Sequence, residues 1–485
     1  MPPGESDSPS AYFLGGTIVL NRVAETASPP PYFQWHNAKW RCPAVHYRLL
    51  RPWLVEQDIR NTVPRWRNLT LTLNDKRDPH PYQAEALQAW QEAGRWGSVV
   101  LPTGAGKTFL ALQAMAACSV STLVVVPTLD LLHQWYALLE NAFGGPIGVW
   151  YGQEKRLESI TVTTYPSAWA QAELLGNQFK LIVFDEIHHL PAPSWHEIAL
   201  MCAAPYRLGL TATYPDPLDT DPPSRTNAPT QSANPQSPVS NYQLPITNYQ
   251  SPASLLNDLV GPVVYRKKID DLTGQQLAEY RTERIRIDLT PEERAAYDAA
   301  YATYTGYVRE ARLRESHGPH WWDEFTRRSA YEVQARRAKV AEMKLKEIVH
   351  QAQGKLDILD SLLREHRHRQ MLIFTAHNRF AYQIARRYLI PVITHQTKAA
   401  ERKAILDDFR AGTYEAIVTS KVLNEGVDVP EAKVAVVLGG SASAREYVQR
   451  LGRVLRKKGN AQATLFEIIA RKTVDERIAR RRRPR

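Results

Sequence analysis

The sequence predicts an α/β protein with two separate parallel sheets, and three observations lead to this prediction. Short β-branched runs alternate with helical stretches from about residue 98, as in "SVVLP", "STLVVVP", "SITVTTY", "KLIVFDE" and "RLGLTAT". The alternation returns further on, in "MLIFT", "PVITHQ", "EAIVTS", "AKVAVVLGG" and "ATLFEII". A charged helical stretch separates the two segments. Apolar runs of four to eight residues between amphipathic helices are typical of a parallel sheet with both faces covered.

Length and composition agree with several soluble domains. The chain has 485 residues, 44% of them apolar, which allows three or four domains with buried cores. Its net charge of +11 favours a polyanionic partner, although a merely basic protein is the alternative. The three cysteines form no C-x-x-C pair, so neither a zinc site nor a disulfide framework is expected. No apolar run approaches the roughly 20 residues of a membrane span, and no signal peptide is apparent, so we expect a cytoplasmic protein without membrane contact.

The first 75 residues precede the alternating pattern. Residues 1–10 are rich in Pro, Ser and Gly, and we expect them to be disordered; residues 11–75 are expected to form a small domain. Its tryptophans either stack on distorted DNA or fill the core of the domain. These residues, with the basic ones beside them, are Trp35, Trp40, Trp53, Arg41 and Arg51.

Residues 76–265 are expected to form the first α/β domain, whose central feature is "LPTGAGKTF" at residues 101–109. This stretch resembles a phosphate-binding loop, but Leu101 stands where the usual pattern has its first glycine. The setting is a strand, a glycine-containing loop and a helix, in which backbone N–H groups can cradle phosphate. Lys107 is expected to reach the β- and γ-phosphates, and Thr108 to hold Mg²⁺. Gly104 and Gly106 supply the unusual backbone angles.

Two acidic residues end a later strand, in "VFDEIHHLPAP". Asp185 is the candidate for the second Mg²⁺ contact, and Glu186 is placed to polarise the attacking water. A solvated turn is the alternative interpretation. His188 and its neighbour His189 have no further metal ligands clustered with them, so we interpret His188 as a hydrogen-bonding coupler.

The remaining segments differ in composition. Residues 215–253, within the first α/β domain, are rich in Pro, Ser, Asn, Gln and Thr, which predicts a disordered insertion. Residues 266–350 are expected to form a linker and a helical segment, which is helical from about residue 290 to residue 350, and residues 351–485 the second α/β domain with a basic tail. In the helical segment, Arg309, Arg312 and Arg314 stand beside Tyr304 and Tyr307, which suggests either a grip on duplex DNA or an ordinary amphipathic helix with tyrosines in the core.

These motifs carry a family resemblance. "LPTGAGKT", "DEIHHLPA", "LTAT" and "QRLGRVLR" resemble motifs I, II, III and VI of superfamily 2 helicases. "YQAEAL" resembles the Q motif, and "VVVPTLDLLHQW", "TVTTY", "LIFT" and "TSKVLNEGVDVP" resemble motifs Ia, Ib, IV and V. The ordered set runs from about residue 77 to residue 483. "SKVLNEGVDVPEAKVAVVLGG" and "LVGPVVYRKKIDDL" are most similar to the XPB group, in its archaeal and bacterial form.

The resemblance implies two tandem RecA-like domains, a damage-recognition-like N-terminal domain and a helical thumb. It implies a DNA-dependent ATPase that moves 3′ to 5′ in DNA repair, with ATP and Mg²⁺ as cofactors. Arg453 and Arg456 are then arginine fingers. The residues implied to bind nucleotide are Tyr82, Gln83, Thr103, Gly104, Ala105, Gly106, Lys107, Thr108, Gly426 and Asp428. Those implied to couple the site to motion are His188, Thr211, Thr213 and Gln449.

DNA contacts are expected on backbone phosphates, since a translocating enzyme must ignore sequence. The residues implied by the resemblance are Thr128, Thr164, Thr375, Ser420 and Lys421. The arginines at positions 480–483 are expected to hold phosphate, with a solvated tail as the alternative.

Two departures leave alternatives open. The group has an Arg-Glu-Asp triplet after motif III, whereas here "LTAT" is followed by "YPDPLDT". A duplex translocase or restriction-type motor that does not separate strands is therefore the second hypothesis, with a partner nuclease for any cleavage. An ATP-switched DNA-binding scaffold and an RNA helicase are further alternatives. His80 also stands where the group has Arg, which puts the specificity for adenine in doubt. The sequence leaves the oligomeric state open.

Overall fold

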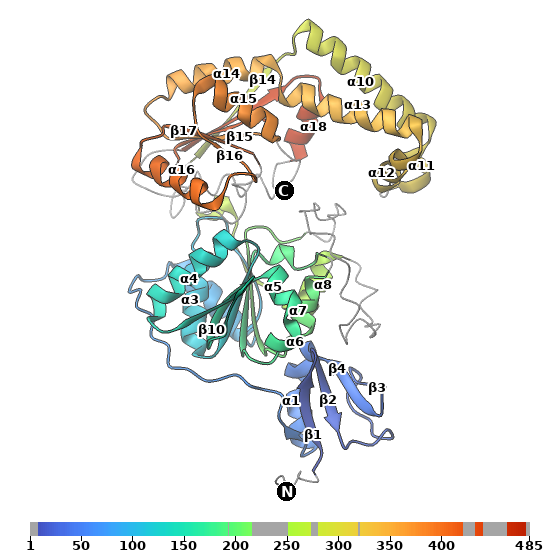
Figure 1. The fold of residues 1–485 in the computed structure, drawn as a ribbon, viewed down its shortest axis with the longest axis vertical. Coiled ribbons are helices and arrows are strands. Elements are labelled where there is room, and N and C mark those ends of the chain that lie inside the picture. Colours follow the sequence, from blue (N-terminus) through green and yellow to red (C-terminus); the bar gives the residue numbers. More distant parts are fainter. Residues whose placement is uncertain are drawn as a thin grey trace. The chain divides into compact units, whose positions relative to one another are not determined.

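The computed structural model describes residues 8–192, 194–215, 251–272, 280–318, 321–420, 432–439 and 463–481. The chain divides into two compact units, one holding most of the chain up to Lys267 and the other running from Lys268 onward (Figure 1). Nearly all of the insertion expected at 215–253 lies outside the described residues. Each unit is described by itself below.

The N-terminal region forms a small sheet with strand order β3-β4-β2-β1-β5. The sheet packs on helix α1, and its core contains Ile18, Leu20 and Leu50, with Trp40 and Trp53 packed against it. The indole of Trp40 donates a hydrogen bond to the carbonyl of Ala24 at 2.8 Å, so these two tryptophans serve the fold. The elements are β1 (Ser10–Leu14), β2 (Thr17–Asn21), β3 (Gln34–His36), β4 (Lys39–Pro43), η1 (Ala44–His46), α1 (Tyr47–Glu56) and β5 (Arg60–Asn61).

The larger sheet of the first unit has strand order β13-β6-β12-β11-β7-β10-β8-β9, and all pairs are parallel except β8–β9. Its strands are β6 (Trp96–Val100), β7 (Thr122–Val126), β8 (Ile147–Tyr151), β9 (Glu154–Arg156), β10 (Ile160–Thr164), β11 (Leu181–Asp185), β12 (Tyr206–Thr211) and β13 (Val263–Arg266). Five of the β-branched runs in the sequence are β6, β7, β10, β11 and β12, as predicted. Four central strands are buried on both faces, which explains their continuous apolar runs.

Helices cover both faces of this sheet, with α3 and α4 on one side and α5 and α7 on the other (Figure 1). The helices are α2 (Pro81–Glu92), α3 (Lys107–Cys118), α4 (Leu129–Phe143), α5 (Tyr165–Ala170), α6 (Ala172–Leu175), α7 (His196–Leu200) and α8 (Pro252–Leu259), with the short turn η2 (Ile187–His189). Because the strands are parallel, the segments that follow β6, β7, β10, β11 and β12 all meet at one edge of the sheet. The predicted motifs I, Ia, Ib, II and III are these segments.

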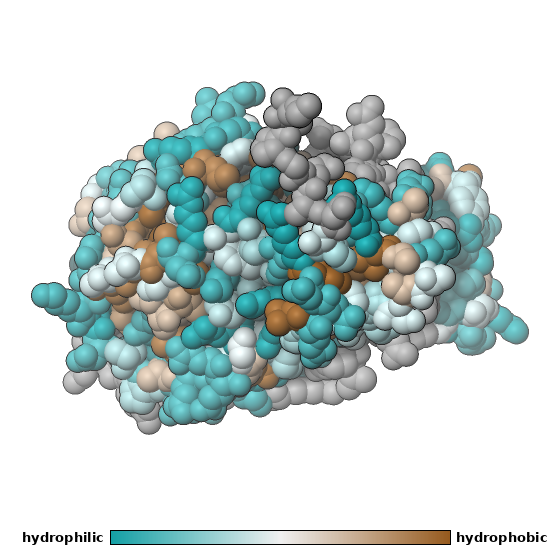
Figure 2. Space-filling view, turned by 90° about the horizontal axis from the view of Figure 1, so that it is seen from below, coloured by the Kyte–Doolittle hydropathy of each residue, from teal (hydrophilic) through white to brown (hydrophobic). Residues whose placement is uncertain are grey.

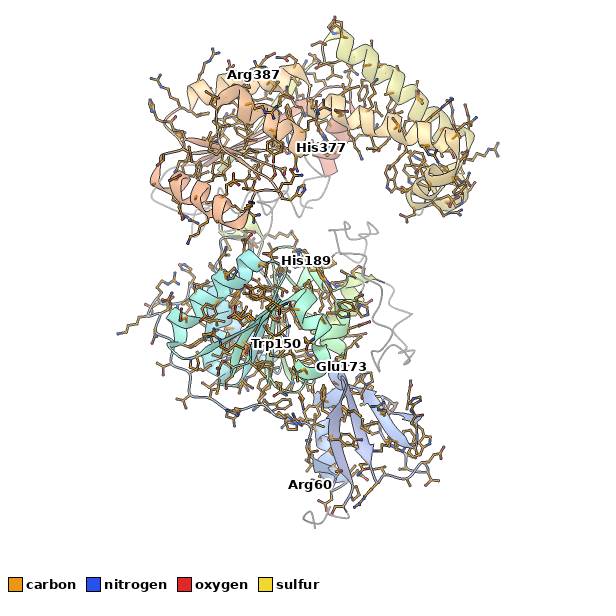
Figure 3. The ribbon with its side chains drawn as sticks, viewed as in Figure 1. Arg60, Trp150, Glu173, His189, His377 and Arg387 are labelled. Atoms are coloured by element: carbon orange, nitrogen blue, oxygen red, sulfur yellow. The ribbon has the colours of Figure 1, made fainter. Side chains whose placement is uncertain are left out.

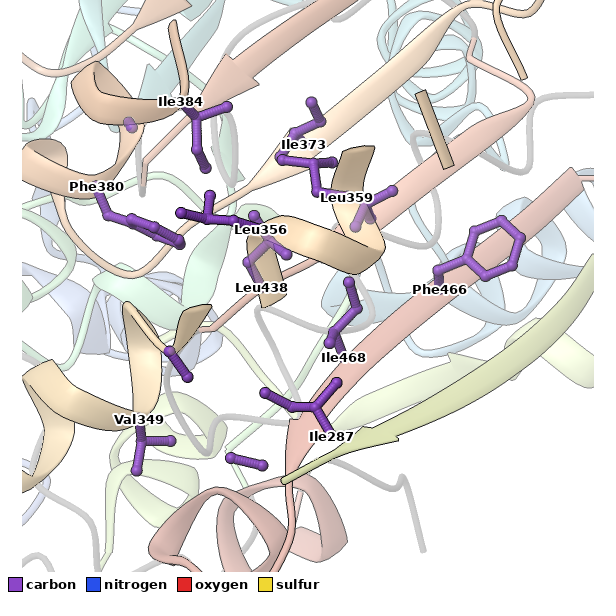
Figure 4. Packing of buried hydrophobic residues seen from close by; sticks show 14 of the residues in the cluster. Ile287, Val349, Leu356, Leu359, Ile373, Phe380, Ile384, Leu438, Phe466 and Ile468 are labelled. Atoms are coloured by element: carbon purple, nitrogen blue, oxygen red, sulfur yellow. The ribbon is translucent and has the colours of Figure 1, made fainter. Parts of the chain in front are cut away.

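The second unit contains a parallel sheet with strand order β14-β19-β18-β15-β17-β16. Its core joins the sheet to α14, and Leu356, Leu359, Ile373 and Phe466 are among the packed side chains (Figure 4). The elements are β14 (Tyr280–Ile287), α14 (Gln353–Glu365), β15 (Met371–Phe374), α15 (Asn378–Tyr388), β16 (Val392–Ile393), α16 (Ala399–Ala411), β17 (Ala416–Thr419), β18 (Val434–Val437), β19 (Ala463–Ala470) and α18 (Val474–Arg481).

The linker before the helical segment of the second unit contains a strand that was not predicted from the sequence. Residues 280–287, expected in that linker, are β14, which pairs in parallel with β19 over eight residues. Ile285 and Ile287 alternate with charged residues there, which is the period of a strand rather than a helix. The short helix α9 (Ile269–Leu272) precedes β14, and the helices that follow are α10 (Pro291–Glu310), α11 (Leu313–His317), α12 (Trp321–Tyr331) and α13 (Val333–His350).

These helices enclose their own small core. Tyr307, Leu313 and Phe325 are buried in it, and Tyr304 packs against it. Both tyrosines named in the sequence thus belong to the core, whereas Arg309, Arg312 and Arg314 are exposed. The two tyrosines therefore fit the interpretation as an ordinary amphipathic helix with tyrosines in its core. Of the five residues singled out in the sequence, the three arginines are the ones exposed and able to contact phosphate.

The surface is mostly hydrophilic on the face shown in Figure 2, where hydrophobic residues form small separate patches. Across the described ranges, no helix has the length and apolar character that crossing a membrane requires.

Candidate active site

The loop after β6 has the geometry of a phosphate cradle. Gly104 and Gly106 have φ angles of +87° and +75°, a region that L-residues rarely adopt. Helix α3 begins at Lys107 immediately afterwards. The missing first glycine is explained by Leu101, whose N–H donates to the carbonyl of Thr211 at 3.0 Å. Leu101 thus continues the strand pairing of β6 with β12, and the turn starts only after it.

Asp185 ends β11 and is buried, with 6% of its surface exposed. Its carboxylate accepts hydrogen bonds from the indole of Trp135 at 2.8 Å and from the N–H of Glu186 at 3.0 Å. Burial, helped by the neighbouring charge of Glu186, raises the pKa of Asp185 to about 6, although the Trp135 hydrogen bond and Lys107 oppose this shift. The carboxylate is therefore held rigidly at the edge of the sheet.

Glu186 adopts a left-handed backbone conformation, with φ +48°. This is unusual for a residue with a side chain and is frequent at functional sites. The turn directs its carboxylate toward the loop, where Oε1 lies 3.9 Å from Lys107 Nζ. Oε2 lies 3.4 Å from His188 Nδ1 and 3.5 Å from Thr211 Oγ1. Residues from three different strand ends thus surround one carboxylate.

The predicted coupling residues of the first domain form a connected network. His188 Nδ1 lies 3.0 Å from Thr211 Oγ1. The Thr211 hydroxyl donates to the carbonyl of Thr213 at 2.8 Å, and the N–H of Thr213 donates back to it at 3.1 Å. The turn after β11 is therefore linked to the turn after β12. His189, labelled in Figure 3, lies on the same turn as His188 and packs against Tyr165 and Trp195.

The first turn of α2 contacts the loop directly. The Nε2 of Gln83 donates to the carbonyl of Gly106 at 3.4 Å, while its Oε1 accepts from the N–H of His80 at 3.0 Å. A Cβ at position 106 would lie 2.4 Å from Gln83 Nε2, so the contact requires glycine there. Tyr82 is buried and stacks on His80, with ring centroids 5.6 Å apart.

The residues at this edge fit a Mg²⁺–nucleotide. Thr103 Oγ1 is buried without a hydrogen-bond partner, as expected for a group that awaits a ligand. The Lys107 ammonium supplies a positive charge beside the two carboxylates, since it lies 3.9 Å from Glu186 and its charge also acts on Asp185. The described part of the chain holds no group of three or more His, Cys, Asp or Glu that could form a metal cage. Mg²⁺ is usually bound by one or two protein ligands plus phosphates, so such a cage is not needed.

The predicted DNA-contact residues occupy strand ends in both units. Thr128 and Thr164 are the N-caps of α4 and α5, and their hydroxyls accept N–H groups of those helices. Thr375 and Ser420 follow β15 and β17, which are paired strands; both are buried, and the Thr375 hydroxyl faces the carbonyls of His377 and Thr419 at 3.3 Å each. Lys421, Gly426, Asp428, Gln449, Arg453 and Arg456 lie outside the described residues.

Trp135 is the main residue that sequence reasoning missed. It lies on the buried face of α4 with Leu132 and Leu139, and a tryptophan at this spacing is normally a core residue. Only the fold reveals that its indole reaches Asp185, so no sequence signal distinguishes it.

Two family models match the chain, one in each of its α/β parts. Residues 76–216 match the family model described as "Type III restriction enzyme, res subunit", and residues 354–458 match "Helicase conserved C-terminal domain". Dbp5 from S. cerevisiae, solved with RNA and ADP BeF3, has a TM-score of 0.51 at 12% identity, over 84% of this chain and 88% of that one. That similarity concerns the fold alone, which consists of tandem RecA-like domains.

Curated relatives give the more specific match. The chain is 38% identical to "DNA 3'-5' translocase XPB2" of Sulfurisphaera tokodaii over 91% of this chain and 92% of that protein. It is 28% identical to "DNA 3'-5' helicase XPB" of Mycobacterium tuberculosis over 80% of this chain, but spans only 60% of that protein. With the ordered motifs and the geometry above, these matches show that the chain belongs to the XPB family of superfamily 2 helicases.

Proposed function

We propose that this chain is a DNA-dependent ATPase that moves 3′ to 5′ along DNA and opens it, and that it acts in DNA repair. The observation that carries the proposal is the meeting of Lys107, Glu186, His188 and Thr211 at one edge of the sheet. A loop that only bound nucleotide would not need a carboxylate held by a network from three strand ends. The family relatives bear names of DNA 3'-5' translocases and helicases.

Each residue has a distinct role in this proposal. The N–H groups at the start of α3 and the ammonium of Lys107 hold the phosphates. Glu186 orients the attacking water and accepts its proton, with His188 and Thr211 beside its carboxylate. Thr108 and Asp185 would hold Mg²⁺, which neutralises phosphate charge when it is bound. When the γ-phosphate leaves after hydrolysis, the contacts of the Glu186 carboxylate change. The network through Thr211 and Thr213 then transmits this change to the turn after β12.

The test separates nucleotide binding from hydrolysis. Lys107→Ala should lose ATP turnover and weaken nucleotide binding, because the phosphate contact is removed. Glu186→Gln should lose turnover but retain binding, because the amide keeps the size of the side chain without its basicity. Steady-state hydrolysis and equilibrium binding of ADP measure the two effects. Normal turnover in both variants would refute the site assignment.

A duplex translocase that does not separate strands remains the second candidate. The segment "YPDPLDT" after Thr213 lacks the triplet associated with strand separation, and one relative is named a translocase. ATP-driven release of a third strand from a DNA triplex, without displacement of a strand from a fork, would favour this candidate. A partner nuclease is proposed only for this second case.

A further inference from the structure

Positively charged side chains gather at the edge of the larger sheet that lies opposite to the candidate active site. Because the strands are parallel, the motif loops follow the strand ends at one edge, and the strand starts lie at the other. Arg95 directly precedes β6, Lys180 directly precedes β11, and Tyr206 is the first residue of β12. The strand order β6-β12-β11 therefore places Tyr206 between the two cations. The roles proposed above concern the other edge.

The two cations share the ring of Tyr206. The guanidinium of Arg95 lies 4.9 Å from its centroid and the ammonium of Lys180 lies 5.5 Å from it. Arg95 Nη1 donates to the Tyr206 hydroxyl at 3.0 Å, so the hydroxyl can donate its own proton to another acceptor. Lys180 Nζ donates to Asn68 Oδ1 at 3.4 Å, which uses one of its three N–H groups. These groups therefore present several hydrogen-bond donors and two positive charges at one place.

Two further cations lie next to this pair. Arg48, on α1, and Arg207, on β12, lie 5.1 Å and 4.7 Å from the ring of Trp96. A Cβ at Gly94 would lie 2.5 Å from Arg48 Nη2, so the guanidinium of Arg48 covers the turn that precedes Arg95. Arg207 is buried and donates to backbone carbonyls. Burial, and after it the charge of Arg48, lowers the pKa of Arg207 to about 10.

We call these four cations the basal cluster: Arg48, Arg95, Lys180 and Arg207. Among the described residues of the first unit, no ion pair joins any of them to a carboxylate. Contacts with aromatic rings offset part of the repulsion between such charges, and an anion bound from solution would offset more of it. Arg95 also has a left-handed backbone, with φ +62°, a conformation that is frequent at functional sites.

The row of cations continues along the same edge. The N–H of Arg65 donates to the carbonyl of Asn177 at 3.0 Å, and the N–H of Arg67 donates to Ser121 Oγ at 3.2 Å. Both arginines are exposed. Ser121 directly precedes β7, which is the neighbour of β11 in the sheet. Basic residues thus follow the strand starts from β6 to β7, and an extended row of this kind matches a chain of phosphates better than a single small anion.

We infer that Arg95, Tyr206 and Lys180, with the rest of the basal cluster beside them, bind backbone phosphates of duplex DNA. The ring of Tyr206 already carries two cations, so it is not an open platform for an unpaired base, and the contact is made with the backbone. This site goes beyond the proposed function. It is separate from the DNA contacts expected beside the motifs, and it requires no nucleotide.

The experiment measures the affinity of the full chain for a labelled DNA duplex at several NaCl concentrations, without nucleotide. Lys180→Gln and Arg95→Gln should each weaken binding and lower the slope of log K against log[salt] by about 1, the effect of one lost phosphate contact. Tyr206→Phe keeps the ring but removes the hydroxyl, so it should weaken binding about threefold and leave the slope unchanged. Thermal unfolding of each variant checks that the fold is retained.

Lys155→Gln is the matched control. The Lys155 ammonium also lies over an aromatic ring, 5.1 Å from the centroid of Trp150, but on β9 at the far end of the strand order. Its affinity and salt slope should stay close to those of the wild type. Acetylation of lysines in the wild-type chain, read by mass spectrometry, tests the same contact without any substitution: duplex DNA should protect Lys180 and leave Lys155 reactive.

Several results would overturn the inference. Wild-type affinity and slope in both Lys180→Gln and Arg95→Gln, or losses no larger than in Lys155→Gln, would remove the phosphate contact. Protection of Lys180 by inorganic pyrophosphate but not by DNA would assign the cluster to a free anion, and protection only by a glutamate-rich peptide would assign it to an acidic protein. These results leave the proposed ATPase standing, whereas absence of ATP turnover in the wild-type chain would count against the proposed function alone.

Discussion

At the scale of single residues, the backbone of Glu186 determines how the site works. Its left-handed conformation turns the carboxylate toward Lys107 while Asp185, the preceding residue, stays buried against Trp135. The two adjacent acids thus have different neighbours. Such separation is a common way to give neighbouring carboxylates different roles. In the proposed mechanism, Asp185 would hold the metal and Glu186 would act on the water.

The contact between His188 and Glu186 predicts a defect in turnover rather than in binding. His188→Ala should lower DNA-stimulated kcat about tenfold, a change of roughly 1.4 kcal/mol in the activation free energy, because the His188 ring lies 3.4 Å from the Glu186 carboxylate and limits its orientations. The affinity for ADP should change little, since His188 has no role at the phosphates. Steady-state kinetics give the kcat, and equilibrium titration gives the affinity.

His189→Ala is the neighbouring control, because His189 packs on Tyr165 and Trp195 rather than on Glu186. Its kcat should stay closer to that of the wild type. Equal losses of kcat in both variants would mean that the whole turn, and not the contact with Glu186, limits turnover.

At the scale of elements, a buried ion pair ties α14 to α18. Lys355 and Asp475 are 2.7 Å apart and almost fully buried, and Lys355 also donates to the carbonyl of Leu438 at 2.7 Å. Removing one partner leaves a buried charge alone, so Lys355→Ala should destabilise the second unit by about 3–5 kcal/mol. Denaturant unfolding measures the change in the free energy of unfolding.

The exposed pair of Arg379 and Glu347 is the matched control. Its atoms lie 3.3 Å apart, with the Arg379 side chain 84% exposed. Arg379→Ala should therefore cost less than about 1 kcal/mol. A cost for Lys355→Ala as small as this would show that water reaches the buried pair.

The junction of η1 and α1 predicts an acid-sensitive element. His46 stacks on Tyr32, with ring centroids 4.2 Å apart. Burial, and secondarily the charge of Arg207, lowers the pKa of His46 to about 4. In the unfolded chain the imidazole of His46 takes up a proton near pH 6.5, whereas in the folded chain it does so only near pH 4. Protonation therefore favours the unfolded chain, and the free energy of unfolding falls by about 3 kcal/mol in total as the pH drops from 6.5 to 4.

Unfolding of the wild type and of His46→Gln at pH 7 and pH 5 checks this prediction. The wild type should lose about 2 kcal/mol more than the variant between the two pH values. Parallel losses in both proteins would assign the acid sensitivity to other groups.

At the scale of the whole molecule, the sequence best predicted the helices and strands, whose formation depends on residues close together in the chain. The β-branched runs form the expected strands, and the run from Leu129 to Phe143 forms helix α4, because the periodicity of each run reflects which residues are buried. The predicted motifs lie together at one edge of the larger sheet because the strands that precede them are parallel. The strand β14 was missed, since its alternation is short and highly charged.

Long-range side-chain contacts could not be predicted in the same way. Trp135 and Asp185 are 50 residues apart and their hydrogen bond depends on how α4 packs on the sheet. The pairing of Arg77 with Phe109 depends similarly on how the segment before α2 lies on α3. Such contacts arise from packing, which the pattern of one sequence does not encode. Residues 421–431 and 440–462 lie outside the described residues, so the roles assigned to them from the sequence stay predictions.

The central claim is that ATP hydrolysis by this chain is coupled to DNA. Steady-state hydrolysis with no nucleic acid, single-stranded DNA, duplex DNA, forked DNA and RNA, with Lys107→Ala as control, tests it most directly. We expect strong stimulation by DNA, weaker stimulation by RNA and no turnover in the variant. Hydrolysis that DNA does not stimulate, or that RNA stimulates equally, would show that the ATPase is not coupled specifically to DNA.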